Sequence, residues 1–178
     1  MNKSRTFYTI LITGLVIALV LCGAVIAYMF RQTEYENNEF TPAEVSCEVE
    51  EAFDGTQKTS VQIENTGNID AYLRVRFVSY WVDSNGNVVP KASEMPDITM
   101  ADGWLKGSNG TYYYTVPVAP DGLTDNLLAA PMILRQDDNG YLQVVEVFAE
   151  AIQSEPAKAV TGSWSVTVDD DGNITAVN

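Results

Sequence analysis

The sequence predicts an all-β protein: a β-sandwich preceded by an N-terminal apolar helix. Three observations lead to this fold class. Long stretches alternate between apolar and polar residues, as a strand with one buried face does. Turn sequences rich in Asn, Asp and Gly separate these stretches. Helical periodicity is almost absent, and many short strands joined by such turns are typical of a sandwich.

The N-terminal apolar segment, residues 7–30, carries no charge and follows two basic residues. It is long enough to span a bilayer. Its basic flank, and the small residues before a cut between Ala27 and Tyr28, are also typical of a signal peptide. We expect residues 1–27 to be removed on export, which places the domain outside the cell. A retained membrane anchor is the alternative.

The chain is acidic, with 24 acidic against 10 basic residues and a formal charge of −14. The basic flank of the apolar segment stays inside the cell, so the acidic remainder is exported. An acidic domain repels nucleic acid and anionic membranes, and neither is an expected partner. Cys22 lies in the apolar segment, so Cys47 is expected to form no intrachain disulfide after cleavage.

Residues 28–44 form an acidic lead-in without periodicity, and alternation begins at Val45, the start of a predicted domain over 45–178. The lead-in holds apolar residues that could anchor it, as a donor strand, on the sheet edge of a neighbouring copy. They are Tyr28, Met29, Phe30, Tyr35 and Phe40. A disordered spacer is the alternative interpretation of this segment.

Within the domain, the alternation predicts strands at residues 59–65 and 70–82. Their predicted core positions are Val61, Ile63, Ala71, Leu73, Val75, Phe77 and Trp81, with Tyr72 and the two arginines of 70–82 on the opposite face. Further predictions are a hairpin at 104–116, a long strand at 141–153, a short helix at 155–160 and a terminal hairpin at 163–175. Pro117, Pro120 and Pro131 confine their segments to edges or connections.

Three acidic turns, residues 83–87, 137–140 and 169–173, supply the oxygen atoms that calcium prefers. Their glycine, however, stands at the fourth position, whereas a calcium loop requires it at the sixth. Asp, Asn and Gly also favour hairpin turns for backbone reasons. We therefore interpret these segments as turns and expect no metal or cofactor, with weak calcium binding left open.

Catalytic chemistry is poorly supported because the chain contains no histidine. This excludes His-containing triads and most general-base schemes. A carboxylate pair that hydrolyses sugars remains a hypothesis, but we expect no enzyme. Five aromatic residues could form a carbohydrate platform, although core packing is the favoured interpretation. They are Trp104, Tyr112, Tyr113, Tyr114 and Trp164.

Arg74 and Arg76 stand on the face of strand 70–82 opposite its core residues. We interpret them as charge partners of acids on a neighbouring strand, on an exposed sheet face, with Glu64 as one such acid. The alternative is a grip on an acidic ligand.

Several segments together resemble a known family. They are "GAVIAYMF" with its acidic lead-in, "EFTPAEVSCEVEEAFDGTQKTSVQIENTGNIDAYLRVRFV", "GWLKGSNGTYYYTVPVAPDGLTDNLL" and "VEVFAEAIQSEP". Their order and spacing are similar to those of the TasA/camelysin-like, SipW-dependent secreted proteins of Gram-positive bacteria. The sequence departs from the family at Met29-Phe30-Arg31, where Thr-Asp is expected. The resemblance implies a jelly-roll or immunoglobulin-like sandwich, cleavage by a dedicated signal peptidase, and a role as a biofilm-matrix fibre subunit. Some relatives are labelled metallopeptidases, and the lack of histidine argues against that activity here.

Three functions are therefore hypotheses for this chain. The first is a secreted structural subunit of an extracellular matrix or biofilm fibre, whose partners are further copies of itself or related matrix proteins. The second is a membrane-tethered module for binding or adhesion at the cell surface. The third is a hydrolase that uses carboxylates.

Overall fold

The computed structural model describes residues 13–14, 16–25 and 42–177. Residues 13–14 and 16–25 are helical, and no described helix has the length and apolarity needed to span a bilayer. The predicted cleavage and donor residues, from Ala27 to Phe40, lie outside the described residues. Residues 42–178 form a compact unit separate from residues 1–41, and it is this unit that carries the fold.

The compact unit is mostly β-structure in open antiparallel sheets, as predicted from the alternating pattern. Its strands are β1 (Cys47–Phe53), β2 (Gln57–Asn65), β3 (Ala71–Val82), β4 (Val88–Val89), β5 (Trp104–Lys106), β6 (Thr111–Tyr114), β7 (Met132–Ile133), β8 (Leu142–Gln153), β9 (Val166–Val168) and β10 (Ile174–Val177). One helix, α2 (Lys158–Trp164), lies between β8 and β9.

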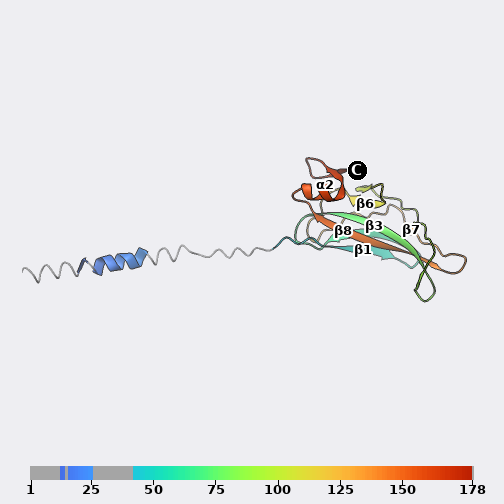
Figure 1. Ribbon diagram of the computed structural model, residues 1–178, viewed down its shortest axis with the longest axis horizontal. Coiled ribbons are helices and arrows are strands. Elements are labelled where there is room, and N and C mark those ends of the chain that lie inside the picture. The colour runs from blue at the N-terminus through green and yellow to red at the C-terminus, as the bar shows by residue number, and fades with distance from the viewer. Residues whose placement is uncertain (1–12, 15, 26–41, 178) are drawn as a thin grey trace, which may run out of the picture. The chain divides into compact units, whose positions relative to one another are not determined.

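In the larger sheet the long strand β3 is central, and the equally long β8 lies beside it at an edge. They pair antiparallel residue for residue, from Ala71 opposite Gln153 to Val82 opposite Leu142. On its other side β3 pairs with β6 and, at its end, with β4, while β5 pairs with β6. The predicted strands at 70–82 and 141–153 and the predicted hairpin at 104–116 are therefore confirmed (Figure 1).

The smaller sheet has the order β1-β2-β7. The register of β1 and β2 shifts between Ala52 and Phe53, because Ala52 lies opposite Ser60 and Phe53 lies opposite Lys58. The extra residue, Thr59, makes a β-bulge, which re-aims the side chains beyond it. Lys58 consequently lies on the same side of the sheet as the core residues and is only 4% exposed.

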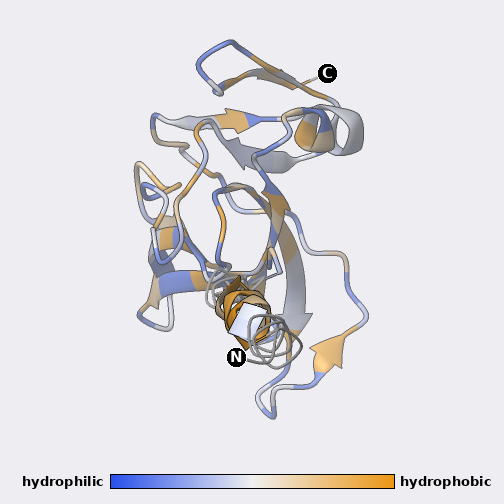
Figure 2. Ribbon diagram, turned by 90° about the vertical axis from the view of Figure 1, so that its left-hand side faces the viewer, coloured by the Kyte–Doolittle hydropathy of each residue, from blue (hydrophilic) through white to orange (hydrophobic). Residues whose placement is uncertain are grey.

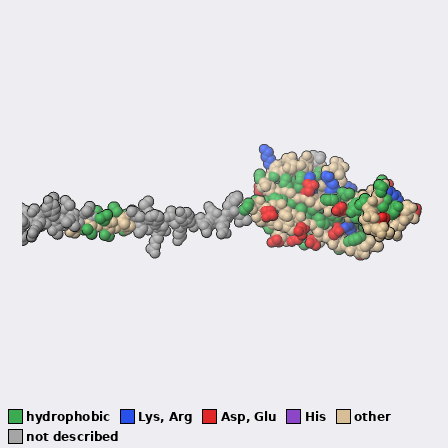
Figure 3. Space-filling model, turned by 60° about the horizontal axis from the view of Figure 1, so that its bottom comes forward, with side chains coloured by type: hydrophobic (Ala, Val, Ile, Leu, Met, Phe, Trp, Pro, Cys, Tyr) green, Lys and Arg blue, Asp and Glu red, His purple; other side chains and the backbone are tan. Residues whose placement is uncertain are grey.

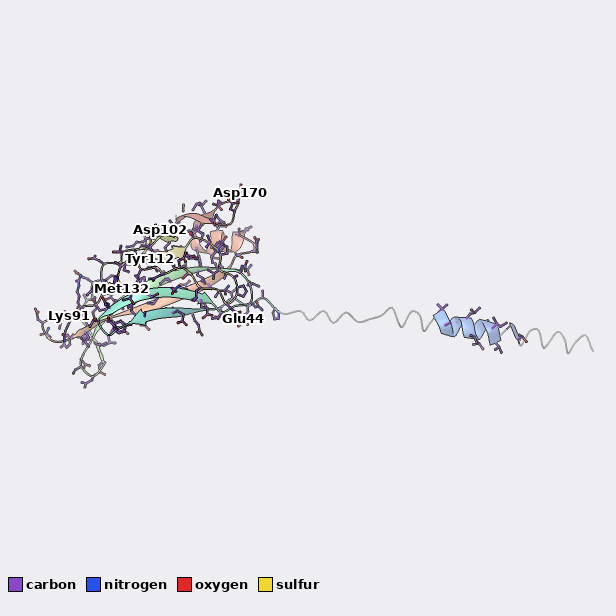
Figure 4. All side chains as sticks on the ribbon, turned by 180° about the vertical axis from the view of Figure 1, so that it is seen from behind. Glu44, Lys91, Asp102, Tyr112, Met132 and Asp170 are labelled. Carbon is purple, nitrogen blue, oxygen red and sulfur yellow. The ribbon has the colours of Figure 1, made fainter. Side chains whose placement is uncertain are left out.

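The main core draws its side chains from both sheets. It contains Val61, Ile63, Leu73, Val75, Phe77, Trp104, Tyr112, Tyr114, Val118, Leu127, Leu128, Met132 and Val145. Tyr112 comes from the larger sheet and Met132 from the smaller one, and both lie within the domain (Figure 4). The core positions predicted for residues 59–65 and 70–82 are all buried.

A second, smaller core lies on the opposite face of the larger sheet. Its buried residues are Tyr72, Tyr113, Val160, Trp164, Val166 and Ile174. The prediction that Tyr72 faces outward is wrong. Tyr72 is 1% exposed, because α2 and the β9–β10 hairpin cover this part of the sheet, and its hydroxyl donates to the Gly172 carbonyl at 2.8 Å. Figure 2 shows the hairpin and α2 together on one side of the domain.

The helix is displaced along the chain from its predicted position at 155–160. It begins at Lys158 and ends at Trp164, so two residues assigned to the terminal hairpin are helical instead. The reason is burial of the Trp164 ring, which packs against Tyr113 with 5.9 Å between ring centroids. The hairpin itself is confirmed as β9 and β10.

Candidate functional site at two open strand edges

Two of the longer strands, β1 and β8, each have only one neighbour among the described residues. β1 pairs only with β2, and β8 pairs only with β3, so each leaves one edge open. The two strands contact each other although they belong to different sheets. Open edges present backbone N–H and C=O groups to any extended chain that reaches them. The chain therefore has two open edges side by side.

Hydrogen-bond geometry tells which backbone groups of β8 face outward. The N–H of Ser154 donates to Asp70, on the β3 side, whereas the N–H of Gln143 donates to Arg135, on the other side. Since successive residues of a strand point their backbone groups in opposite directions, the odd-numbered residues face away from β3. Val145, Val147, Ala149 and Ala151 thus carry free edge groups, for which no backbone partner occurs among the described residues.

A cavity of about 370 Å³ lies at this edge. It is lined by Val49, Glu51, Phe53, Lys58, Tyr80 and residues 144–147, and we call it the edge cavity. Phe53 is 50% exposed at its rim. Figure 3, in which the side of the domain that carries β1 comes forward, shows acidic side chains beside apolar ones. The edge cavity offers an apolar surface next to free backbone groups, which is what an added strand needs.

The charged pair in the edge cavity was not predicted from the sequence. The Lys58 ammonium lies 2.6 Å from a carboxylate oxygen of Glu51 and 5.2 Å from the centre of the Phe53 ring. Lys58 stands in the polar run Gln57–Ser60, where alternation alone gives no sign of burial. Only the bulge, which depends on pairing with β1, turns its side chain inward.

Arg74 pairs with an acid on a neighbouring strand, as predicted, but the acid is Glu150 of β8 and not Glu64. Nor is its face of the sheet open: the Arg74 side chain is 17% exposed, and its guanidinium lies 4.5 Å from the centre of the Trp164 ring. Arg76 is exposed and donates to the Thr111 hydroxyl at 3.4 Å. Within the described residues it has no carboxylate partner.

The three acidic segments are turns closed by their own aspartates, as predicted. Asp83 and Asp169 each accept hydrogen bonds from the backbone N–H groups two and four residues further on. A side-chain hydrogen bond from Asn87 is the largest cause of the lowered pKa of Asp83. At Asp137 the hydrogen bond from Lys91 is the largest cause, and the pKa falls to about 2. Among the described residues no group of His, Cys, Asp and Glu is arranged to hold a metal ion.

The aromatic residues pack in the two cores, as the favoured interpretation predicted. All five are buried, and they make ring contacts with one another such as Trp104 with Tyr114 at 5.1 Å. No exposed aromatic platform is formed by them.

Cys47 is a free thiol, also as predicted. Burial is the main cause that raises the pKa of this thiol, and the charge of Glu150 raises it further.

No family model, curated protein or solved structure significantly matches this chain. The arguments on function therefore rest on the residues and on the geometry described above.

Proposed function

We propose that this protein is a secreted structural subunit of an extracellular matrix or biofilm fibre. The observation that carries the proposal is the pair of open strand edges, β1 and β8, with the edge cavity between them. A core that draws on both sheets supports the finer description of the domain as a β-sandwich, of jelly-roll or immunoglobulin-like type. The resemblance to the TasA/camelysin-like family supports the same function and the same fold.

In the proposed assembly, residues 28–40 of one subunit add as a strand to the β8 edge of the next. The incoming backbone bonds to the outward groups of Val145, Val147 and Ala149, and alternate side chains enter the edge cavity. Cleavage between Ala27 and Tyr28 by a signal peptidase frees the donor segment, so that assembly begins only outside the cell. Each subunit both donates and accepts, which gives an open head-to-tail fibre.

Deletion of the donor tests the proposal. Residues 28–178 are purified and examined by electron microscopy beside a form that begins at Thr41. We expect fibres from the first form and monomers from the second. Fibres that form at an unchanged rate without residues 28–40 would falsify the donor role.

The acceptor edge is tested by Ala149→Pro, with Ala149→Ser as the matched control. Proline removes an N–H that faces away from β3, so the sheet keeps its own hydrogen bonds. The serine variant keeps the N–H at nearly the same size. We expect fibres to be lost only in the proline variant, with both variants folded by circular dichroism.

N-terminal sequencing of the protein from cells distinguishes this function from a membrane-tethered surface module. We expect a mature N-terminus at Tyr28, within a few residues, in the culture supernatant. Met1 retained in the membrane fraction would support the tether instead.

A further inference from the structure

A second cavity, of about 340 Å³, lies on the face of the larger sheet that α2 and β10 cover. The residues that matter here are Arg74, Ser108, Tyr113, Ser163, Trp164 and Ser165, and we call it the Arg74 cavity. Its volume falls within the range of about 300–1,000 Å³ that small-molecule sites occupy. It shares no lining residue with the edge cavity, and a ligand bound in it would not depend on fibre assembly.

The cation of this cavity is held in place with part of its hydrogen-bonding capacity unused. The Nε and Nη2 groups of Arg74 both donate to one carboxylate oxygen of Glu150. The guanidinium plane is covered by the Trp164 ring at 4.5 Å and lies 5.9 Å from the Tyr113 ring. The Nη1 group has no partner among the described residues. Arg74 therefore lines the cavity as a fixed cation with one unused donor group.

Two further donors in the cavity have no protein partner in the described part of the chain. Tyr113 is 1% exposed and Trp164 is 7% exposed, yet neither the phenol hydroxyl nor the indole N–H makes a hydrogen bond there. No side-chain nitrogen or oxygen in that part is both shut off from solvent and unpartnered. Both atoms are thus accessible to solvent, and both residues line the cavity. A ligand in the cavity could therefore accept hydrogen bonds from both groups in place of water.

The donors define the chemistry of that ligand. An indole N–H and a guanidinium can only donate, so the facing group must accept hydrogen bonds, and a carboxylate accepts a charge-assisted hydrogen bond from the remaining Nη1 group of Arg74. The three serine hydroxyls can both donate and accept, which suits hydroxyl groups on the remainder of the ligand. The Trp164 face is already taken by Arg74, so the ligand does not stack on it. We propose that the Arg74 cavity binds the carboxylate and hydroxyls of one acidic sugar, a hexuronate.

Nuclear magnetic resonance of the form that begins at Thr41, which is expected to stay monomeric, tests the proposal through the indole N–H signals. Trp164 is the reporter, and two tryptophans serve as internal references because their indoles already donate, Trp81 to Ala92 at 3.1 Å and Trp104 to Asp125 at 3.2 Å. D-Glucuronate, D-glucose and acetate are titrated separately. We expect glucuronate to shift the Trp164 signal alone, with an affinity about ten-fold higher than that of glucose or acetate. An equal response to glucose, an equal response to acetate, or no response to glucuronate overturns the proposal.

Tyr113→Phe separates binding from folding. The lost hydroxyl has no protein partner in the described residues, so the melting temperature should stay unchanged while the affinity for glucuronate falls about five-fold. Tyr112→Phe is the matched control, because its ring points into the main core on the other face of β6. An equal effect of the two variants on affinity would contradict the assignment.

Discussion

Lys58 is the one charged side chain that is buried in the described part of the chain, and Glu51 compensates its charge. An unpaired ammonium in this position would lose its hydration without a replacement. Glu51 keeps 35% of its side chain exposed, so water can solvate its carboxylate if the lysine is removed. Loss of Glu51 should therefore destabilise the fold more than loss of the Lys58 charge does.

Two substitutions measure this asymmetry. Lys58→Met removes the charge and keeps an apolar chain of similar length, so we expect the free energy of unfolding to change by less than about 1 kcal/mol. Glu51→Ala leaves the buried ammonium unpaired and should cost about 1–3 kcal/mol. Urea unfolding of the monomeric form that begins at Thr41 gives both values. The ion-pair argument is wrong if Lys58→Met proves the more costly change.

At the scale of elements, the turn after β2 makes hydrogen bonds to the segment that precedes β1. Thr66 and Asn68 donate from their backbone N–H groups to Ser46 and Glu44, and the Asn68 side chain accepts from the Glu44 N–H at 2.7 Å. Gly67 lies between them, where a Cβ would be 2.4 Å from the Glu44 carbonyl oxygen. The turn needs glycine here because the neighbouring backbone leaves no room.

Gly67→Ala should therefore destabilise the domain by about 1–3 kcal/mol, the usual cost of overpacking. Gly162→Ala is the matched comparison, since a Cβ at this position in α2 meets nothing within 4 Å. Alanine favours helix over glycine, so this variant should gain about 0.5–1 kcal/mol. Thermal unfolding of the two variants should shift in opposite directions, and a shift of the same sign in both would refute the steric argument.

The turn between β1 and β2 makes the stability of the domain depend on pH in the acidic range. Asp54 accepts hydrogen bonds from the backbone of Thr56, the largest cause, and of Gln57, and these lower its pKa from 3.8 to about 2. A carboxyl whose pKa is lower in the folded state adds stability above the unfolded value, and this stability is lost as pH falls from 3.8 towards 2.

Asp54→Asn cannot ionise, so its melting temperature should fall less steeply over this pH range than that of the unsubstituted protein. Asp102→Asn serves as the control, because Asp102 is exposed and its carboxylate makes no hydrogen bond among the described residues (Figure 4). If the melting temperatures of all three proteins fall equally steeply with pH, the Asp54 turn does not contribute to the acid dependence of stability.

The strands could be predicted from the sequence because their signal is local. Alternation over β3 and the Asn-Gly turn between β5 and β6 are visible in the chain itself. The buried Tyr72 and Lys58 could not be predicted, since one depends on the cover that α2 provides and the other on a bulge in the pairing with β1. The same limit applies to the edge cavity and the Arg74 cavity, which join residues about a hundred positions apart.

At the scale of the whole molecule, the acidic charge opposes assembly. The formal charge is −14, and the proposed cleavage after Ala27 also removes Lys3 and Arg5, so exported subunits repel one another more strongly than the full chain would. β1, one of the two open edges, itself carries exposed Glu48, Glu50 and Glu51. The subunits should therefore remain soluble at low salt although their strand edges are open.

Salt should accelerate fibre formation by residues 28–178. The screening length falls from about 30 Å at 0.01 M to about 8 Å at 0.15 M ionic strength, so repulsion between approaching edges is largely removed. We expect the initial rate, followed by light scattering, to rise over this range, and the form that begins at Thr41 to remain monomeric throughout. If screening is the whole effect, fibre formation in calcium should be no faster than in sodium at the same ionic strength. If the rate instead falls with salt, attraction between opposite charges drives the association. The argument that repulsion between acidic subunits opposes strand pairing would then be wrong.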